Sequence, residues 1–422
     1  MAKNSVAQTY PLQKKYHTTE FLRGMLHLRP RVPAQTALLH LRSWVIARIS
    51  TYFVEADFVQ VHPPIITSSD CEGAGEVFTV SSTAPYTFEE PVSVMQPAST
   101  PISSSQQQED HFFRAQKYLT VSSQLHLECF AHAVPKVWTL SPTFRAERSD
   151  TNRHLSEFYM LEAEISFVNK LEDIMVVVEE MTRYVVSGLI NTRVGKEIAE
   201  MYANRLADTT TNNNQDDSLD DTDGGLKMRW ESLLTPQPWT RMTYTEAIEH
   251  LLQAVARGEE KFVFEPQWGN TLQAEHERFL VEKFGAVNPA GGDGGGGPIF
   301  VTHYPAVIKP FYMLPSTLDG ASSTVACFDL LFPHVGEIVG GSLREHRYQN
   351  LVDKMRELEL ISPGINGEGS GVLEWYAELR KWGSVPHGGF GMGFDRLLAY
   401  LAGIKDVREV VGFPRWKGRS DC

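Results

Sequence analysis

The chain has 422 residues, of which 42% are hydrophobic and 22% are charged. This composition excludes fibrous and wholly disordered proteins, and the length suits one large domain or two to three smaller ones of roughly 150 residues each. The formal net charge of −13 excludes a chain that is basic throughout, so any contact with nucleic acid must use a local basic surface.

The apolar runs and the cysteines indicate the cellular environment in which the protein is expected to fold. The longest apolar runs, such as residues 174–178, are far shorter than the ~20 residues of a membrane-spanning helix, so no membrane partner is expected. The four cysteines are scattered without a CxxC pair, which disfavours a zinc site and a disulfide framework and predicts an intracellular compartment. Residues 1–16 show neither an apolar signal core nor an Arg-rich presequence.

Hydrophobic periodicity predicts an α+β fold. Apolar residues recur at helical spacing over Pro33–Ala56, and the alternating segment Phe58–Pro64 that follows predicts a strand closed by prolines. A second long helix is predicted over Leu171–Leu189. Further strands are predicted at Tyr118–Ser122, Lys136–Leu140 and Phe158–Phe167. Short strands linked by turns favour an antiparallel sheet flanked by helices, and no glycine-rich motif of the Rossmann or P-loop type follows a strand.

Three segments are predicted to be mobile loop insertions, because their composition cannot bury enough apolar surface to offset the entropy of ordering. The segment at about 81–110 is rich in Ser, Thr, Pro and Gln, that at about 208–225 in Thr, Asn and Asp, and that at about 288–298 in Gly.

The segment 143–158 is the densest in functional side chains. It carries Arg145, Arg148, Arg153 and His154 around a polar turn. A strand, loop and second strand of this kind can direct guanidinium groups at a polyanion, since arginine binds phosphate oxygens in a bidentate manner. The alternative is a solvated hairpin with surface ion pairs.

Two carboxylates in apolar surroundings form a second cluster. Asp329 and Glu337 are expected on neighbouring strands, where an unpaired carboxylate is costly. Such a pair suits Mg²⁺, which takes one or two protein carboxylates together with substrate phosphates. The alternative is a carboxylate satisfied by a buried arginine such as Arg344.

Two glycine-containing segments complete the candidate sites. Glycines at 389, 391 and 393 precede Arg396, where a helix is expected to begin, and they allow a flat ligand or another backbone to approach closely. The acidic segment 69–76 is either a simple turn or a site for an ammonium group.

In their order along the chain, these motifs resemble the signatures of class II aminoacyl-tRNA synthetases. The helix and strand ending at Pro64, the Phe144-Arg145-x-Glu147 loop, and Gly391-x-Gly393-x-x-Arg396 carry this likeness. Finer features are similar to the asparaginyl-tRNA synthetases of bacterial and organellar type. They are Ser69-Asp70-Cys71-Glu72-Gly73-Ala74-Gly75-Glu76, Arg153-His154-Leu155-x-Glu157-Phe158, Ile308-Lys309-Pro310-Phe311-Tyr312-Met313, Glu337-Ile338-Val339-Gly340-Gly341-Ser342-x-Arg344-Glu345, Gly383-Ser384-Val385-Pro386-His387 and Phe413-Pro414-Arg415.

The resemblance implies a catalytic domain over 33–416, preceded by a connector (1–32) and followed by a short tail (417–422). In such enzymes the amino-acid carboxylate attacks the α-phosphate of ATP, and the resulting aminoacyl-adenylate then passes its acyl group to the terminal ribose of a tRNA. No covalent enzyme intermediate is needed, so catalysis depends on positioning and on charge stabilisation.

The resemblance also implies a nucleotide site. Arg145 would hold the α-phosphate and stabilise the transition state, while Glu147 would face the adenine and Phe158 would stack on it. Arg153 and His154 would reach the outer phosphates.

By the same resemblance, Arg396 and Gly393 would hold the opposite face of the nucleotide. Asp329 and Glu337 would ligate Mg²⁺, which neutralises charge on the leaving pyrophosphate. Glu337 is thereby also counted among the ATP-binding and catalytic residues, with Arg145 and Arg396.

For the amino acid, the resemblance implies that Glu72 and Gln124 take the α-ammonium group and that Arg344 meets the side-chain carbonyl, with Glu162 in the same pocket. Related aspartate-specific enzymes carry a lysine shortly after the corresponding glutamine, whereas this chain has none there and a glutamate follows. Loss of a cation and gain of an anion favour L-asparagine. His126 is expected to be either a neutral wall of the pocket or an ordinary packed side chain.

The expected partners are ATP, Mg²⁺, L-asparagine, tRNA(Asn) and a second copy of the chain, in a two-fold dimer formed by residues 33–64. The likeness begins near Tyr10, which leaves no room for the N-terminal barrel that reads the anticodon in this family. The chain is therefore either part of a longer product or a stand-alone catalytic module. Two alternatives follow: a barrel-less paralogue that activates aspartate, or a non-catalytic dimerisation module. The mitochondrial matrix is the expected compartment, with the cytoplasm as the alternative.

Overall fold

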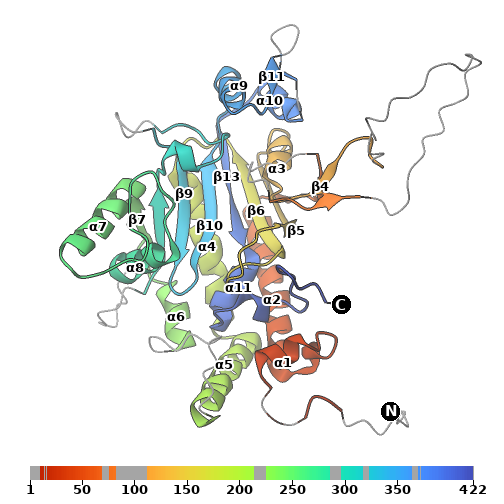
Figure 1. Ribbon diagram of the computed structural model, residues 1–422, viewed down its shortest axis with the longest axis vertical. Helices are drawn as coiled ribbons and strands as arrows, with labels where there is room; N and C mark the ends of the chain where they lie inside the picture. Colours follow the sequence, from red (N-terminus) through yellow and green to blue (C-terminus); the bar gives the residue numbers. More distant parts are fainter. Residues whose placement is uncertain are drawn as a thin grey trace, which may run out of the picture.

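The computed structural model has an eight-stranded sheet at its centre (Figure 1). It describes residues 10–13, 15, 17–68, 76–81, 112–212, 225–285, 296–316, 323–363, 369–370 and 372–421. The strand order is β1-β5-β6-β13-β10-β9-β8-β7. Their bounds are β1 Val59–Gln60, β5 Lys136–Phe144, β6 Glu157–Ser166, β7 Thr240–Thr243, β8 Ile299–Thr302, β9 Cys327–Phe332, β10 Gly336–Leu343 and β13 His387–Gly393.

The middle of the sheet is antiparallel, as predicted, but its two outermost pairs, β1 with β5 and β7 with β8, are parallel. The strand predicted over Phe58–Pro64 is shorter than expected: only β1 is a strand, because the chain turns away at its prolines. The strand predicted at Tyr118–Ser122 is β4 (Lys117–Leu119), which pairs with β2 (Ile66–Thr67) and β3 (Thr79–Val80) in a separate small sheet. A further hairpin is formed by β11 (Ser362–Pro363) and β12 (Gly369–Ser370).

Both predicted long helices are present, α2 over Pro33–Glu55 and α4 over Leu171–Leu189. The other helices are α1 Thr19–Arg23, α3 Gln124–Ala131, α5 Arg193–Asn212, α6 Leu226–Ser232, α7 Tyr244–Ala256, α8 Ala274–Phe284, α9 Tyr348–Glu357, α10 Glu374–Lys381 and α11 Phe394–Ala402, with the 3₁₀ helices η1 Arg29–Arg31, η2 Ala306–Ile308 and η3 Val407–Glu409.

The predicted insertions at 81–110, 208–225 and 288–298 fall largely outside the described residues. The second one begins later than predicted, because α5 continues to Asn212. Buried residues of α5, namely Val194, Ile198 and Met201, anchor this helix. Once a helix is nucleated, adding a further turn costs little free energy.

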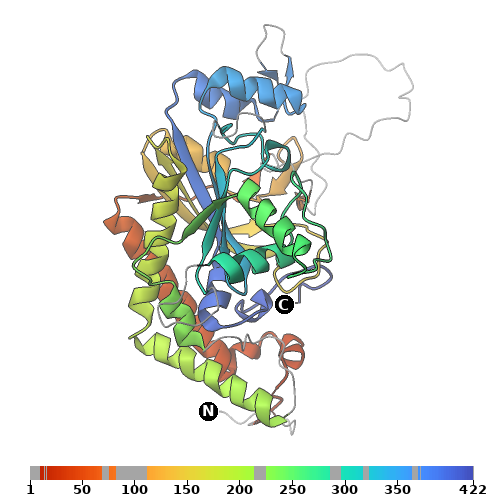
Figure 2. The same cartoon turned by 90° about the vertical axis from the view of Figure 1, so that its left-hand side faces the viewer.

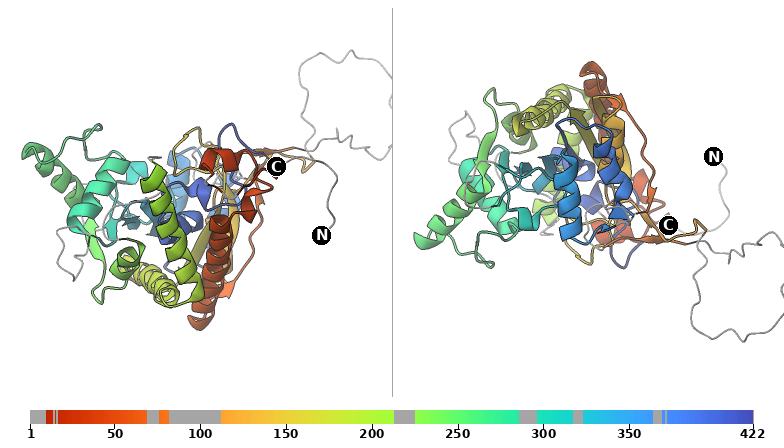
Figure 3. Two further views of the ribbon diagram at one scale, coloured as in Figure 1. Left: turned by 90° about the horizontal axis from the view of Figure 1, so that it is seen from below. Right: turned by 90° about the horizontal axis from the view of Figure 1, so that it is seen from above.

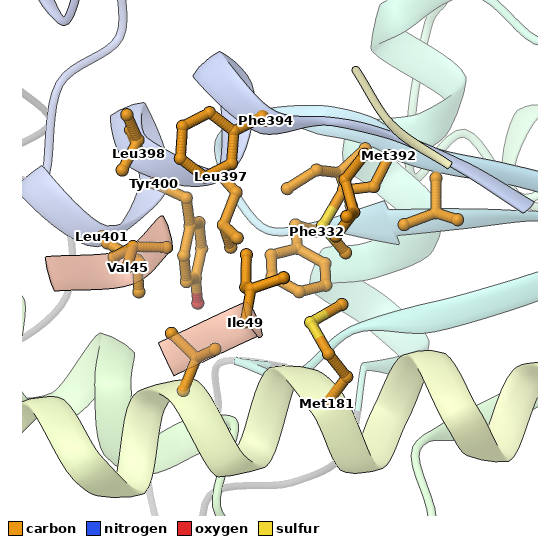
Figure 4. Packing of buried hydrophobic residues seen from close by; sticks show 14 of the residues in the cluster. Val45, Ile49, Met181, Phe332, Met392, Phe394, Leu397, Leu398, Tyr400 and Leu401 are labelled. Carbon is orange, nitrogen blue, oxygen red and sulfur yellow. The ribbon is translucent and has the colours of Figure 1, made fainter. Parts of the chain in front are cut away.

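One face of the sheet is covered by helices and forms the main core. Residues of α2, α4, α5 and α11 pack there against β6, β9, β10 and β13. Helices α2 and α5 lie side by side (Figures 2 and 3). In Figure 4, Ile49 from α2, Met181 from α4, Phe332 from β9 and Tyr400 from α11 meet in this layer. Burial of such side chains contributes roughly 1.5–3 kcal/mol each.

The opposite face of the sheet is covered only in part. Helices α7 and α8 pack over β7, β8 and β9 around a second, smaller core, and α9 and α10 pack together in a third cluster. Between them, the middle of this face stays open. No helix in the described ranges is long and apolar enough to cross a membrane.

The N-terminal segment is attached to the body of the molecule by a buried ion pair. Arg29 is fully buried, and its Nη2 donates to Glu409 Oε2 at 3.1 Å and to the backbone carbonyls of Arg408 and Glu409 at 3.0 Å each. Arg23 donates to the other oxygen of Glu409 through Nε at 2.8 Å. These contacts fix η3 against the segment that precedes α2.

Substitution Glu409→Ala is expected to destabilise the fold by ~3 kcal/mol, because it removes the carboxylate to which the buried guanidinium of Arg29 donates. Urea unfolding measures this change. The control is Glu20→Ala, whose carboxylate pairs with Arg419 at the surface and is expected to cost less than ~1 kcal/mol. Equal stabilities of the two variants would contradict this account of the attachment.

Candidate active site

The open face of the sheet holds a cavity of about 340 Å³. All the described residues to which the resemblance assigns a substrate or a metal line it. These residues are Gln124, Arg145, Glu147, Arg153, His154, Phe158, Glu162, Asp329, Glu337, Arg344, Gly393 and Arg396. Glu72 and most of the acidic segment 69–76 lie outside the described residues. The structure therefore brings together groups that are as much as 272 positions apart in the sequence, from Gln124 to Arg396.

Strand alternation produces this cavity. Along β6, the side chains of Phe158, Met160, Glu162 and Glu164 line the cavity. The alternate residues Leu161, Ala163 and Ile165 belong to the main core. Successive side chains of a strand point to opposite faces, so one strand supplies both environments.

Glycines on β13 and β10 form the floor of the cavity. Gly391 pairs with Glu162 on one side and with Gly340 on the other, and Gly340 pairs in turn with Asp329. Gly340, Gly341, Gly391 and Gly393 line the cavity. Because these positions carry no side chains, the space above the sheet stays open.

The loop after β5 forms one end of the cavity. The Arg145 guanidinium lies 5.6 Å from the centre of the Phe158 ring, and its Nη1 lies 3.8 Å from Glu147 Oε1. His154 Nε2 lies 3.3 Å from the other oxygen of Glu147. Burial lowers the pKa of His154; Glu147 opposes this, and nearby arginines, Arg396 first, add to it.

Two arginines from distant elements complete this end. Arg396 lies in the first turn of α11, which begins at Phe394, two residues before the predicted start, and it donates from Nη1 to the backbone carbonyl of Glu337 at 2.7 Å. Arg153 Nη1 lies 3.4 Å from Glu277 Oε2 on α8. Arg148 is exposed and does not line the cavity, so of the three arginines of segment 143–158 only Arg145 and Arg153 reach it.

Asp329 and Glu337 converge above Gly340. A Cβ atom on Gly340 would lie 3.6 Å from Asp329 Oδ1 and 3.7 Å from Glu337 Oε1. Lys309 Nζ donates to both oxygens of Asp329, at 2.9 and 2.7 Å. The alternative in which Arg344 satisfies these carboxylates is wrong, because Arg344 lies beyond the far end of β10 and pairs with Glu164.

This donor set fits a divalent cation. Burial and the negative charge of Asp329 raise the pKa of Glu337 to about 7, although Arg396 and Lys309 act in the opposite direction. The cations already present therefore do not fully compensate the carboxylates, and carboxylate oxygens are the ligands that Mg²⁺ prefers.

The other end of the cavity is built from Gln124, Glu162 and Arg344. Glu162 accepts hydrogen bonds from Ser122 Oγ at 2.5 Å and from the Ser123 backbone N–H at 2.9 Å. Gln124 begins α3 and donates from Nε2 to Glu128 at 3.1 Å. These contacts fix both polar side chains at the wall of the cavity.

Arg344 is held by a buried carboxylate. Its Nε and Nη2 donate to the two oxygens of Glu164 at 3.1 and 3.0 Å. Burial alone would lower the pKa of Arg344, but the carboxylates of Glu164 and Glu128 raise it. His126 does not line the cavity in the structure; its ring packs 5.6 Å from that of Trp375, which fits the packed alternative.

Three further charged residues that line the cavity were not predicted: Glu164, Lys309 and Asp395. Glu164 shares a strand face with Glu162, so the period of two could have indicated it. Lys309 lies in a segment quoted for the resemblance, but no pattern linked it to Asp329. Glu277 on α8 does not line the cavity but lies 3.4 Å from Arg153, and nothing in the sequence indicates this contact.

The sequence matches known proteins over nearly its whole length. The signature of the family described as tRNA synthetases class II (D, K and N) covers residues 19–417. The mitochondrial asparagine–tRNA ligase of Saccharomyces cerevisiae is 41% identical over 416 residues, which are 98% of this chain and 75% of that protein. The asparagine–tRNA ligase of Desulfotalea psychrophila is 41% identical over 415 residues, which are 98% and 77% of the two chains.

Solved structures share the fold as well. The asparaginyl-tRNA synthetase of Pyrococcus horikoshii, complexed with asparaginyl-adenylate, has a TM-score of 0.71 and 30% identity, and the match covers 96% of this chain and 74% of that one. The Entamoeba histolytica enzyme, also with asparaginyl-adenylate, has a TM-score of 0.68 and 26% identity, with 97% and 73% of the chains covered.

The raised pKa of Glu337 predicts a pH-dependent stability. Because the pKa of about 7 exceeds the ordinary value of 4.5, this group contributes stability below about pH 4.5 that is lost as the pH rises to about 7. Without Mg²⁺ or nucleotide, Glu337→Gln should therefore gain ~1–2 kcal/mol relative to the unchanged chain between pH 5 and pH 8. Urea unfolding across this range measures the difference.

The control for that experiment is Glu249→Gln on the exposed face of α7, which removes a carboxylate away from the cavity. A stability difference for Glu337→Gln that stays constant with pH would show that burial does not perturb this carboxyl group.

Proposed function

Because this chain belongs to the class II tRNA synthetases of the D, K and N group, we propose that it activates L-asparagine with ATP and transfers it to tRNA(Asn). Relatives at about 40% identity over nearly the whole chain are asparagine–tRNA ligases. One observation carries the proposal at the level of the site: Arg145, Arg396, Asp329 and Glu337 line a single cavity that also holds Arg344.

Activation joins the two ends of the cavity. The carboxylate of asparagine attacks the α-phosphorus of ATP, the bond to the β-phosphate breaks, and pyrophosphate leaves. Arg145 would contact the α-phosphate and stabilise the charge that develops there, and Phe158 would stack on the adenine. Arg396 would hold the nucleotide from the opposite side of the cavity. No side chain needs to form a bond to the substrate, so the main contribution is orientation.

The outer phosphates would lie against Arg153 and His154, with Glu147 toward the adenine and Gly393 leaving room for the nucleotide. Asp329 and Glu337 would hold Mg²⁺, which when bound neutralises charge on the departing pyrophosphate.

At the amino-acid end, Gln124 would accept or orient the α-ammonium group and Glu162 would line the same pocket. Glu72, which lies outside the described residues, remains a predicted ligand of that ammonium group. Arg344 would donate to the side-chain carbonyl. In the second step a hydroxyl of the terminal tRNA ribose attacks the acyl carbon of the adenylate and AMP leaves.

The pocket composition supports asparagine over aspartate. No lysine follows Gln124 within α3, whereas aspartate-specific enzymes are expected to carry one shortly after this glutamine, and Arg344 is already paired with Glu164. A ligand carboxylate would therefore be desolvated there without an additional cation.

We also propose that the protein is a homodimer formed through residues 33–64. Exposed apolar side chains gather in this segment: Leu39 and Val59 are 46% exposed and Val54 is 70% exposed. Val59 lies on β1, at an edge of the sheet, where a second copy can cover it. A mitochondrial location is proposed from the likeness to the mitochondrial enzymes of two yeasts, and microscopy of a tagged gene product tests it.

Amino-acid-dependent exchange between ATP and pyrophosphate tests the proposed reaction. Exchange is expected with asparagine and not with aspartate, and Arg145→Ala is expected to reduce it by ~10³-fold or more, since one donor to the developing charge contributes that order of rate. Unchanged thermal unfolding of this variant is the control for its fold. Exchange with aspartate alone would identify an aspartate-activating enzyme, and no exchange with either would favour a non-catalytic module.

Val54→Glu is expected to shift the protein from dimer to monomer in sedimentation velocity, because it places a charge in the proposed apolar interface. Leu252→Glu, on the exposed face of α7 with 44% of the side chain exposed, is the matched control and should remain dimeric. A monomeric unmodified chain at micromolar concentration would contradict the proposed interface.

A further inference from the structure

Helix α8 brings a carboxylate to the nucleotide end of the cavity from outside the cavity wall. Its residues Phe279, Leu280 and Val281 are buried in the second core, and the helix packs against β8, β9 and β10 (Figure 1). Glu277 lies about one turn before Leu280 and Val281, so its side chain is on the same side of the helix. Only 12% of this side chain is exposed, although it does not line the cavity. The packing of α8 therefore directs Glu277 at the start of β10.

The carboxylate of Glu277 joins two parts of the nucleotide site. Its Oε2 lies 3.4 Å from Arg153 Nη1 and accepts a hydrogen bond from the Glu337 backbone N–H at 3.3 Å. The backbone carbonyl of Glu337 in turn accepts from Arg396 Nη1 at 2.7 Å. One carboxylate oxygen thus links the loop after β5 to the strand that carries a proposed Mg²⁺ ligand.

The turn before β10 is shaped to admit this carboxylate. Gly336 has a φ of +72°, and a Cβ atom there would clash with Glu277 Oε2 and lie 2.7 Å from Arg153 Nη1. A side chain at this position would therefore displace the ion pair, in addition to straining the backbone. The register of β10 against β9 shifts between Glu337 and Val339, and at this irregularity Glu277 supplies an acceptor for the Glu337 N–H.

We propose that Glu277 is a positioning residue that holds Arg153 in place for the β- and γ-phosphates of ATP. It acts through the guanidinium group and touches no substrate itself. The inference rests on the proposed function, in which the outer phosphates lie against Arg153.

The physical reason is the conformational freedom of an arginine side chain. Arg153 lines the cavity from a polar loop, and 31% of its side chain is exposed. A guanidinium group has five N–H donors, so one can face Glu277 while others remain for phosphate oxygens. Without the carboxylate, the side chain would have to be ordered at the moment when ATP binds, and that cost would reduce the affinity.

The negative charge of Glu277 acts in the opposite direction, because it repels a polyphosphate. This repulsion is offset by the positive charge of Arg153 beside it, and it is weakened by solvent and salt, since the pair is partly exposed. The ordering of the side chain is a local effect that salt does not screen. We therefore expect the loss of order to outweigh the relief of repulsion when Glu277 is replaced.

The test measures the binding of ATP and of AMP to the full chain by calorimetry, with Mg²⁺ and without amino acid. In Glu277→Gln the Kd for ATP is expected to rise by ~5- to 10-fold, the effect of one long side chain that must be ordered on binding. The Kd for AMP, which lacks the outer phosphates, should stay within about twofold of its original value. The comparison is made at pH 8, because burial raises the pKa of Glu277, although Arg153 opposes this.

The matched control is Glu282→Gln on the same helix. Its carboxylate is exposed and lies 3.8 Å from Arg278 at the surface, so the Kd values for ATP and AMP should both stay unchanged. Thermal unfolding of each variant checks its fold.

A double-variant cycle shows whether Glu277 acts through Arg153. In an Arg153→Gln background, Glu277→Gln should change the Kd for ATP by less than about twofold, because the side chain that it positions is gone. A merely structural role would instead weaken ATP binding equally in both backgrounds and would weaken AMP binding as well.

An unchanged Kd for ATP in a folded Glu277→Gln variant overturns the inference, as does an equal loss of ATP and AMP binding. A lower Kd for ATP also overturns it, because Glu277 would then restrain Arg153 away from the phosphates. If this variant does not fold, Glu277→Asp decides: it keeps the charge but withdraws the carboxylate by one methylene group, and an unchanged Kd for ATP overturns the inference. An unmodified chain that binds no ATP would instead reject the proposed function itself.

Discussion

Successive residues of a β-strand point to opposite faces of a sheet, and the site depends on this constraint in β6 and β13. In β13, Phe390 and Met392 are buried in the main core, and Gly391 and Gly393, which alternate with Met392, line the cavity. In β6, core residues alternate with Glu162 and Glu164 in the same way. A shift of register by one residue would bury both carboxylates among apolar side chains and expose the core. The same strands therefore pack against the stabilising helices with one face and line the proposed substrate cavity with the other.

The two ends of the cavity follow opposite electrostatic principles. Where polyphosphate is proposed to bind, the carboxylates are incompletely compensated: burial and the charge of Asp329 raise the pKa of Glu337, although Arg396 and Lys309 act in the opposite direction. Where a neutral side chain is proposed to bind, Arg344 and Glu164 form a buried bidentate pair. A highly charged ligand gains most from groups that lack internal partners, whereas a neutral ligand is selected best by groups whose charges already have them. The distribution of ion pairs thus matches the distribution of charge along the proposed substrates.

The sequence predicted the groups that line the cavity better than it predicted the bounds of the strands. Helices such as α2 carry long apolar stripes, so their extents followed from periodicity alone. β1 was predicted too long, because alternation continues past Gln60 while pairing stops. The site residues were predicted through ordered motifs, in which Arg145 and Arg396 have fixed neighbours. Lys309 lies in such a motif, but its pairing with Asp329 could not be predicted, and Glu277 lies in no motif; both pairs exist only in the folded protein. Local sequence patterns predict helices and strands, but ion pairs between distant elements can be predicted only when the topology of the fold is known.

Contacts between distant elements also join the N-terminal segment to the loop after β5, which carries Arg153 and His154. The Val407 N–H donates to the Asn152 carbonyl at 3.0 Å, and Arg408 Nη2 donates to Asp150 at 2.6 Å. The next residue, Glu409, is the partner of Arg29. A single turn of 3₁₀ helix is therefore bonded on one side to the segment before α2 and on the other to the loop that carries Arg153 and His154. Neither contact stabilises much of the core. Because the loop is polar and has few apolar contacts of its own, its position relative to the sheet must come from such directional bonds. The buried pair of Arg29 with Glu409 and the partly exposed pair of Arg408 with Asp150 thus contribute to the geometry in which the phosphates would be held.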